Sequence, residues 1–185
     1  MHVSRRNQRK YVVSVSEVAL MQLHLAALEA FRQIRRGKRT RLETLGLLWG
    51  KRATDRNEYR YVVEHVTVDT FAKRQKNMVS PSPDDAELKD EIISSFWPEL
   101  ELLGEFHTHP YATTGQVERA RGYEFSREDR AALKREMHER DVYYDSFRVG
   151  LVMAIAELKR SGWQEPKKFN TNNATWKWTL KRHRF

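Results

Sequence analysis

Residues Leu42–Gly50 read LETLGLLWG, a short apolar run that lies between basic segments. An apolar run of this length, bounded by turns, is typical of a buried strand. Residues Tyr59–Val68 follow as YRYVVEHVTV, which is rich in the β-branched and aromatic residues that favour strands. Together the two stretches predict a β-hairpin.

Strands and helices are also predicted on both sides of this hairpin. Upstream, Tyr11–Val15 predicts a strand, and Ser16 caps a helix that we expect to run to about Arg36. The apolar face of that helix consists of Val18, Leu20, Met21, Leu23, Leu25, Leu28 and Phe31.

Downstream of the hairpin the pattern predicts two loops, two helices and three strands. In chain order these are a loop at Thr70–Ser82, a helix from the N-cap Ser82 to about Trp97 with Leu88, Ile92, Ile93 and Phe96 facing inward, a strand at Glu101–His109 ended by Pro110, a loop at Tyr111–Phe125, a helix from Ser126 to about Arg140, and strands at Phe147–Ala156 and Ala174–Lys181. The sum is a mixed α/β domain at 11–185, with a central mixed sheet flanked by helices, after a basic tail at 1–10.

The composition excludes several classes of protein. A length of 185 residues suits one domain, and shares of 39% hydrophobic and 32% charged residues are typical of globular proteins. The absence of cysteine excludes disulfides, thiolate zinc sites and cysteine-nucleophile hydrolases. The longest strongly apolar run, Gly150–Glu157, is too short to span a bilayer, and the N-terminus lacks the apolar core of a signal peptide. We therefore expect a cytoplasmic protein without a membrane partner.

Basic residues give the chain a net charge of +9 and gather in three clusters. Their members are Arg5, Arg6, Arg9 and Lys10; Arg32, Arg35, Arg36, Lys38, Arg39 and Arg41; and Lys181, Arg182 and Arg184. Such clusters bind phosphates or acidic protein surfaces, but solvated helix ends and a basic tail explain them equally well. Since no RNA-binding or zinc-finger motif accompanies them, nucleic acid is a secondary candidate partner.

Two histidines, His107 and His109, stand one residue apart near the end of a predicted strand. Alternate residues of a strand point to the same face about 6–7 Å apart, so both imidazoles can reach one metal ion while Thr108 turns away. On its own, however, this spacing favours two ordinary surface or cleft histidines.

Two further polar features accompany the histidines. Ser126 and Asp129 lie three residues apart at a helix start, a pattern that also forms an ordinary capping box. Glu43 lies at the edge of the first hairpin strand, where a carboxylate is costly unless it is paired or placed in a cleft. This position can also be an exposed strand start.

In combination and in order, these features resemble the JAMM metalloprotease family, the JAB/MPN domain with an intact metal site, as in its prokaryotic stand-alone members. The matching segments are Glu43–Gly50 (ETLGLLWG), His107–Pro110 (HTHP) and Ser126–Asp129 (SRED). The order of the predicted elements over roughly Tyr11–Glu157 also matches. The resemblance implies a single JAB/MPN-like domain.

The resemblance also implies a role for each matching residue. His107, His109 and Asp129 would bind one catalytic zinc ion, with a water in the open fourth position. Glu43 would act as general base on that water and pass the proton to the leaving amine. Ser126 would donate a hydrogen bond to the oxyanion.

Two departures from the family pattern lie close to the histidines. About ten residues usually separate the second histidine from the aspartate, whereas nineteen, Pro110–Glu128, do so here, an insertion that loops absorb at small entropic cost. Glu118 and Glu124 are weaker substitutes for Asp129. Glu105 stands where an aromatic residue is common, and we expect it to contact substrate, to bind the metal or to tune the histidines.

The resemblance implies a zinc-dependent peptidase or isopeptidase that cleaves at the C-terminal tail of a ubiquitin-like protein or of its conjugate. Partners of such enzymes include E1-like and E2-like conjugation enzymes, in antiviral defence systems among others. We expect the loops at Tyr111–Phe125 and Thr70–Ser82 to shape a groove for an extended peptide. Two alternatives remain: a non-catalytic scaffold of the same fold, and a basic accessory protein associated with nucleic acid.

Overall fold

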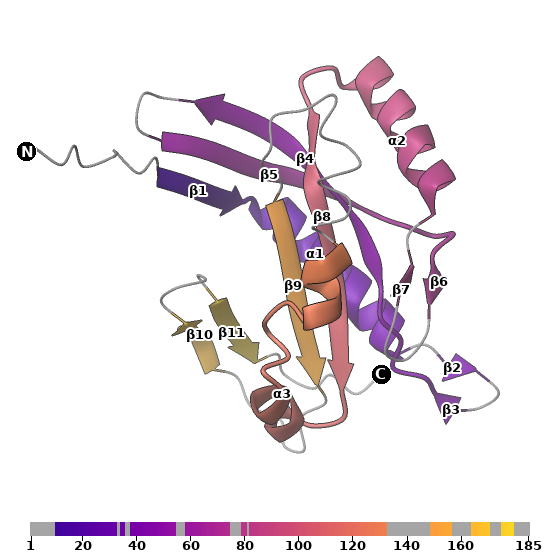
Figure 1. Ribbon diagram of the computed structural model, residues 1–185, viewed down its shortest axis with the longest axis vertical. Helices are drawn as coiled ribbons and strands as arrows, with labels where there is room; N and C mark the ends of the chain where they lie inside the picture. Colours follow the sequence, from indigo (N-terminus) through magenta and orange to yellow (C-terminus); the bar gives the residue numbers. More distant parts are fainter. Residues whose placement is uncertain are drawn as a thin grey trace, which may run out of the picture.

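A mixed sheet of five strands, in the order β1-β5-β4-β8-β9, forms the centre of the computed structural model (Figure 1). The structure describes residues 10–32, 34–35, 38–54, 58–74, 79–80, 82–132, 149–156, 164–170 and 175–179. The sheet strands are β1 (Lys10–Val15), β5 (Glu58–Val68), β4 (Leu45–Thr54), β8 (Glu101–Tyr111) and β9 (Val149–Ala156). β1 is parallel to β5 and β9 to β8, whereas β4 is antiparallel to both of its neighbours. The predicted mixed α/β fold, with one central sheet flanked by helices, is confirmed.

The hairpin of β4 and β5 forms as predicted, but β4 begins at Leu45 rather than at Leu42. The backbone just before the strand makes hydrogen bonds with Thr108 rather than strand pairing. The Thr44 N–H donates to Thr108 Oγ1 at 2.9 Å, and the Thr108 N–H donates to the Thr44 carbonyl at 2.9 Å. Glu43 therefore precedes the strand and does not belong to it.

Helix α1 (Glu17–Arg32) covers one face of the sheet (Figure 1). Its buried residues are Ala19, Leu23, Ala26, Ala27, Ala30 and Phe31. The prediction of its apolar face is wrong for three residues, because Val18, Met21 and Leu25 are 48%, 56% and 50% exposed. Alanines occupy most of the inner side, and their small side chains let the helix lie close to the strands.

Pairs of short strands lie outside the central sheet, in segments most of which were not predicted as strands. They are β2 (Ile34–Arg35) with β3 (Lys38–Arg39), β6 (Lys73–Arg74) with β7 (Val79–Ser80), and β10 (Gln164–Asn170) with β11 (Thr175–Thr179). The helix predicted to run to about Arg36 thus ends at Arg32, and the predicted loop at Thr70–Ser82 contains β6 and β7. β11 lies within a predicted strand, whereas β10 was not predicted, because its sequence QEPKKFN has a proline and no apolar alternation.

Helix α2 (Pro83–Phe96) begins where predicted, although the Ser82 side chain makes no capping hydrogen bond. Three residues expected to face inward are exposed: Leu88 by 50%, Ile92 by 43% and Phe96 by 73%. Of the four, Ile93 is buried. The buried side also carries an ion pair between Asp85 and Lys89, and Lys89 Nζ donates to the Val68 carbonyl at 2.6 Å. A polar anchor at the end of β5 thus helps to orient the helix.

Strand β8 carries both candidate histidines. It was predicted to end before Pro110, but it continues to Tyr111. The pairing of β8 with β4 ends at His107, so Pro110, which has no N–H, lies where β8 has one neighbour, β9. Phe106 packs into the core with α1. Since side chains alternate along a strand, His107 and His109 lie on the opposite face of the sheet.

The chain after β8 returns over this second face. The predicted loop at Tyr111–Phe125 is wrong for residues 114–120, which form helix α3 (Thr114–Ala120). Residues 127–132 are helical, as predicted for the segment after Ser126 (Figure 1). The expected continuation to Arg140 lies outside the described residues, as does the predicted basic tail apart from Lys10. Among the described residues, no helix has the length and apolar character needed to cross a bilayer.

Candidate metal centre

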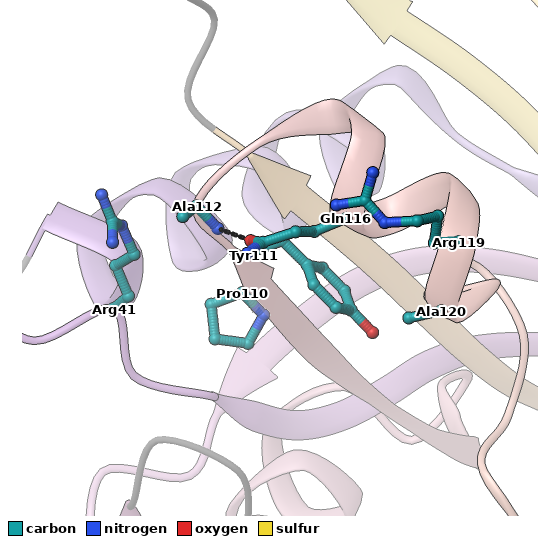
Figure 2. Close-up of a pocket in the computed structure, with 7 residues that line it drawn as sticks. All are labelled: Arg41, Pro110, Tyr111, Ala112, Gln116, Arg119 and Ala120. Atoms are coloured by element: carbon teal, nitrogen blue, oxygen red, sulfur yellow. Dashed lines mark hydrogen bonds between the residues drawn. The ribbon is translucent and has the colours of Figure 1, made fainter.

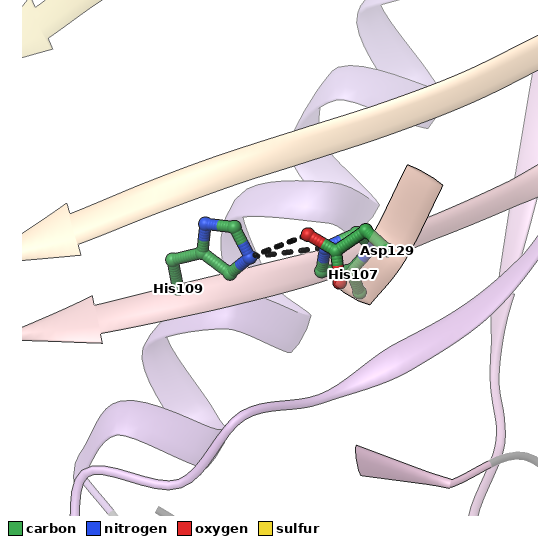
Figure 3. Close-up of side chains that lie close together, drawn as sticks. All are labelled: His107, His109 and Asp129. Carbon is green, nitrogen blue, oxygen red and sulfur yellow. Dashed lines mark hydrogen bonds and ion pairs between the residues drawn. The ribbon is translucent and has the colours of Figure 1, made fainter. Parts of the chain in front are cut away.

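His107, His109 and Asp129 converge on the sheet face opposite α1 (Figure 3). The Nε2 atoms of the two histidines lie 3.0 Å apart. Oδ2 of Asp129 lies 3.3 Å from Nε2 of His107 and 3.4 Å from Nε2 of His109. The three side chains are largely buried, and their donor atoms form a nearly regular triangle that could hold a metal ion.

The size of this triangle suits a tetrahedral site. With zinc–nitrogen and zinc–oxygen distances of about 2.0–2.1 Å, neighbouring ligand atoms of a tetrahedron lie about 3.3–3.4 Å apart. The three sides of 3.0, 3.3 and 3.4 Å are close to that length. Two imidazoles and one carboxylate are also a donor set that zinc accepts, with a fourth position left open.

The tautomer of His109 is fixed by the inserted segment. Its Nδ1 lies 2.8 Å from the carbonyl oxygen of Gly122, which can only accept a hydrogen bond, so Nδ1 carries the hydrogen. The neutral ring then has its lone pair on Nε2, the atom that faces His107 and Asp129. A backbone carbonyl in this place orients the ring and makes Nε2 a better donor to a metal.

Ser126 and Asp129 form a capping box, and Asp129 also belongs to the candidate metal centre. The Ser126 N–H donates to Asp129 Oδ2 at 2.6 Å, and the Asp129 N–H donates to Ser126 Oγ at 3.0 Å. The same Oδ2 faces both histidines. The helix start therefore positions the carboxylate against β8.

Two of the three donor groups have pKa values that favour metal binding. Burial lowers the pKa of His107, and the charge of Asp129 opposes this effect without reversing it. Burial alone would raise the pKa of Asp129, but hydrogen bonds from Ser126 and the electrostatic attraction of the two histidines outweigh it and lower that pKa. Both groups are therefore unprotonated at neutral pH, as a metal ligand must be.

Glu43 lies close to this triangle because Thr44, the next residue, is bonded to Thr108 between the two histidines. Burial, and then the negative charge of Asp129, raise the pKa of Glu43 from 4.5 to about 7. A carboxyl with this pKa gains and loses a proton near neutral pH, which is the property of an effective general base. Glu43 thus lies close enough to Asp129 for the two carboxyl groups to interact.

Other predicted candidates lie outside the donor group. Glu105 lies on the same strand face as the histidines but is not one of the three converging donors. Glu124 is bound to Arg121 at 2.6 Å, and Glu118 belongs to α3, so neither replaces Asp129.

The sequence did not reveal two residues that support the centre. Gly122 provides the carbonyl that binds His109, and a Cβ at that position would lie 2.3 Å from Cε2 of Tyr111. Burial, and then the charges of Glu43 and Asp129, raise the pKa of Tyr111, so its hydroxyl stays protonated at neutral pH. No clear sequence signal marks this turn, since the left-handed residue that ends α3 is Arg121, with φ 50°.

A scan against protein-family models found no match for this chain, and a search of curated proteins found no significant match. The chemistry of the site is therefore inferred from its residues and their geometry.

Proposed function

We propose that the protein is a zinc-dependent peptidase or isopeptidase. The observation that carries the proposal is the triangle of His107, His109 and Asp129 donor atoms with Glu43 close by. Metal-assisted hydrolysis of an amide uses a metal ion to activate water and a base that exchanges protons at neutral pH. The two histidines and Asp129 would supply the metal ligands, and Glu43 would supply the base.

When bound, zinc would act as a Lewis acid that lowers the pKa of water and polarises the substrate carbonyl. Glu43 would take a proton from the attacking water and deliver it to the leaving nitrogen. Ser126 Oγ accepts from the Asp129 N–H, and its hydroxyl hydrogen, which in the free protein helps to lower the pKa of Asp129, would turn to the oxyanion that develops on the substrate. Each role uses an atom held in place by a hydrogen bond or by burial.

The resemblance to JAMM enzymes supports a narrower proposal for the substrate. The scissile bond would be a peptide or isopeptide bond at the C-terminal tail of a ubiquitin-like protein or its conjugate, with E1-like and E2-like enzymes as further partners. The inserted segment also supports an extended substrate, since α3 lies beside the metal centre through the contact of Gly122 with His109.

Metal content and hydrolysis of the purified protein test this function. We expect one zinc ion per chain, and cleavage of either a linear fusion or a lysine-linked conjugate of a ubiquitin-like protein. Glu43→Gln should retain the metal and lose hydrolysis, because it removes the base and leaves the ligands. Glu99→Gln, which neutralises an exposed carboxylate elsewhere, is the matched control.

The opposite results would point to other functions. A wild-type protein that takes up no zinc from a zinc-containing medium would favour a scaffold. Full hydrolysis by the Glu43→Gln variant would contradict the role of this residue as the base.

A further inference from the structure

A pocket of about 550 Å³ opens beside the end of β8 (Figure 2). Arg41 lies on one side of it, Gln116 and Arg119 of α3 lie on the other, and Pro110 and Tyr111 lie between them. Two arginines therefore border one hollow. Its volume is in the range of pockets that hold small ligands or substrate side chains.

Arg41 is held in a defined position at the pocket. Its backbone has φ 46°, a left-handed conformation that arginine adopts rarely. The centre of its guanidinium lies 5.9 Å from the centroid of the Phe31 ring, which stabilises the cation from the α1 side. The next residue, Leu42, donates its N–H to the Ala30 carbonyl of α1 at 3.4 Å. Uncommon backbone conformations of this kind are concentrated at functional sites.

The opposite side of the pocket offers further donors. Gln116 Oε1 accepts the Ala112 N–H at 3.0 Å, which leaves the Nε2 hydrogens of Gln116 for another acceptor. Within the described part of the chain, Arg119 makes no hydrogen bond or ion pair that would neutralise its charge. The pocket thus presents positive charge and amide donors from α3.

The residues that line the pocket lie close in sequence to the residues of the candidate metal centre. Pro110 and Tyr111 directly follow the ligand His109, and Arg41 precedes the base Glu43 by one intervening residue. Tyr111 also packs against Gly122, whose carbonyl binds His109. A substrate residue in the pocket would lie close to the bond that is cut.

We propose that this pocket binds a carboxylate of the substrate, held between Arg41 and Arg119. The proposal rests on the peptidase function proposed above and specifies an acidic residue, or a free C-terminus, near the scissile bond. Guanidinium groups pair with carboxylates through short, charge-assisted hydrogen bonds. Aliphatic lining from Pro110, Ala112 and Ala120 suits the methylene stem of such a residue better than a fully hydrated phosphate.

Nuclear magnetic resonance of the arginine Nε–H groups tests the pocket without turnover. The protein is the full chain with Glu43→Gln, titrated with acetyl-Gly-Gly-Glu-amide and, separately, with acetyl-Gly-Gly-Gln-amide. We expect the acidic peptide to shift the resonances of Arg41 and Arg119, and the neutral peptide to leave them in place. A third peptide, acetyl-Gly-Gly-Gln with a free α-carboxyl group, shows whether the terminal carboxylate binds instead, which also supports the proposal.

Variants give the size of the effect. Arg119→Gln should weaken binding of the acidic peptide roughly three- to tenfold, as expected for loss of one partly exposed charge-assisted contact. Arg60→Gln makes the same charge change on β5, away from the pocket, and should leave binding unchanged. Equal binding of the acidic and neutral amides together with no response to the peptide that has a free α-carboxyl group would overturn the proposal. No effect of Arg119→Gln on the carboxylate that binds would overturn it as well. So would tighter binding of inorganic phosphate than of the acidic peptide, since the pocket would then be a phosphate site.

The results also separate this proposal from the peptidase function. In one outcome, the wild-type protein hydrolyses no conjugate while its arginine resonances still respond to the acidic peptide and not to the neutral one. This result would refute the proposed peptidase function and would support the carboxylate pocket. Hydrolysis together with no arginine response that depends on a carboxylate, in any of the three peptides, refutes the carboxylate pocket and leaves the peptidase function.

Discussion

Thr44 and Thr108 are joined by two hydrogen bonds of 2.9 Å, one in each direction, between segments 64 residues apart in sequence. Both side chains are almost completely buried, at 1% and 0% exposure. Thr108 stands between the two histidines, and Thr44 directly follows Glu43. This pair therefore fixes the candidate base relative to the candidate metal ligands.

Thr108→Val should destabilise the fold and misplace the base. Valine keeps the shape of threonine but removes Oγ1, so the buried Thr44 N–H loses its acceptor, at a cost of about 1–3 kcal/mol. Denaturant unfolding measures this loss, and hydrolysis by the folded variant should also fall. Thr108→Ser keeps the hydroxyl and should lose less stability and less activity than Thr108→Val. Equal unfolding midpoints for the valine variant and the wild type would show that the bond does not stabilise the fold.

Zinc should stabilise the protein through the histidine triangle. A ligand at one hundred times its dissociation constant stabilises the folded state by about 2.7 kcal/mol, so the melting temperature should rise when zinc is added. His109→Ala should abolish this rise, because it removes one of the three donors. His65→Ala, an exposed histidine on β5, is the control and should respond as the wild type does. A rise that persists in His109→Ala would place the metal elsewhere.

The sequence was sufficient for the sheet and for the donor residues, because both depend on local patterns. β-branched and apolar runs mark β4, β5 and β9, and the alternation of a strand places His107 and His109 on one face. The triangle with Asp129 was implied by the motif and is present in the structure.

The orientation of helices and the fold of the insertion were not predictable in the same way. Whether Leu88 or Asp85 of α2 faces the protein depends on tertiary partners such as the Val68 carbonyl, which bonds Lys89. Segment 111–125 contains few apolar residues in a helical period, so α3 and its link from Gly122 to His109 depend on contacts that are distant in sequence.

Glu43→Gln should change how the stability of the metal-free protein depends on pH. Because the folded state raises the pKa of Glu43 from 4.5 to about 7, its contribution to stability is complete below pH 4.5 and is lost as pH rises through about 7. The difference in free energy of unfolding, variant minus wild type, should therefore be roughly 1–2 kcal/mol larger at about pH 8 than at about pH 4. The effect is reduced to this size because solvent screens a half-buried carboxyl. Chemical unfolding at both pH values measures the difference.

Two controls accompany this pH measurement. Glu99→Gln removes an exposed carboxylate and should show no comparable difference between the two pH values. Saturating zinc should reduce the effect of Glu43→Gln, because a nearby dication favours the ionised carboxylate. A constant stability difference between variant and wild type over the whole range would show that the Glu43 pKa is not raised.

Gly122→Ala should weaken metal binding although residue 122 is not itself a ligand. A Cβ there would lie 2.3 Å from Cε2 of Tyr111, so either the Tyr111 ring or the Gly122 carbonyl must move, and the bond to His109 Nδ1 is strained or lost. Partners that orient a ligating histidine typically contribute 10–100-fold to metal affinity, and we expect a loss of about this size in chelator competition. Adding Tyr111→Ala removes the clashing ring and should restore most of the affinity. If Gly122→Ala alone binds zinc as the wild type does, the carbonyl of the insertion does not orient His109.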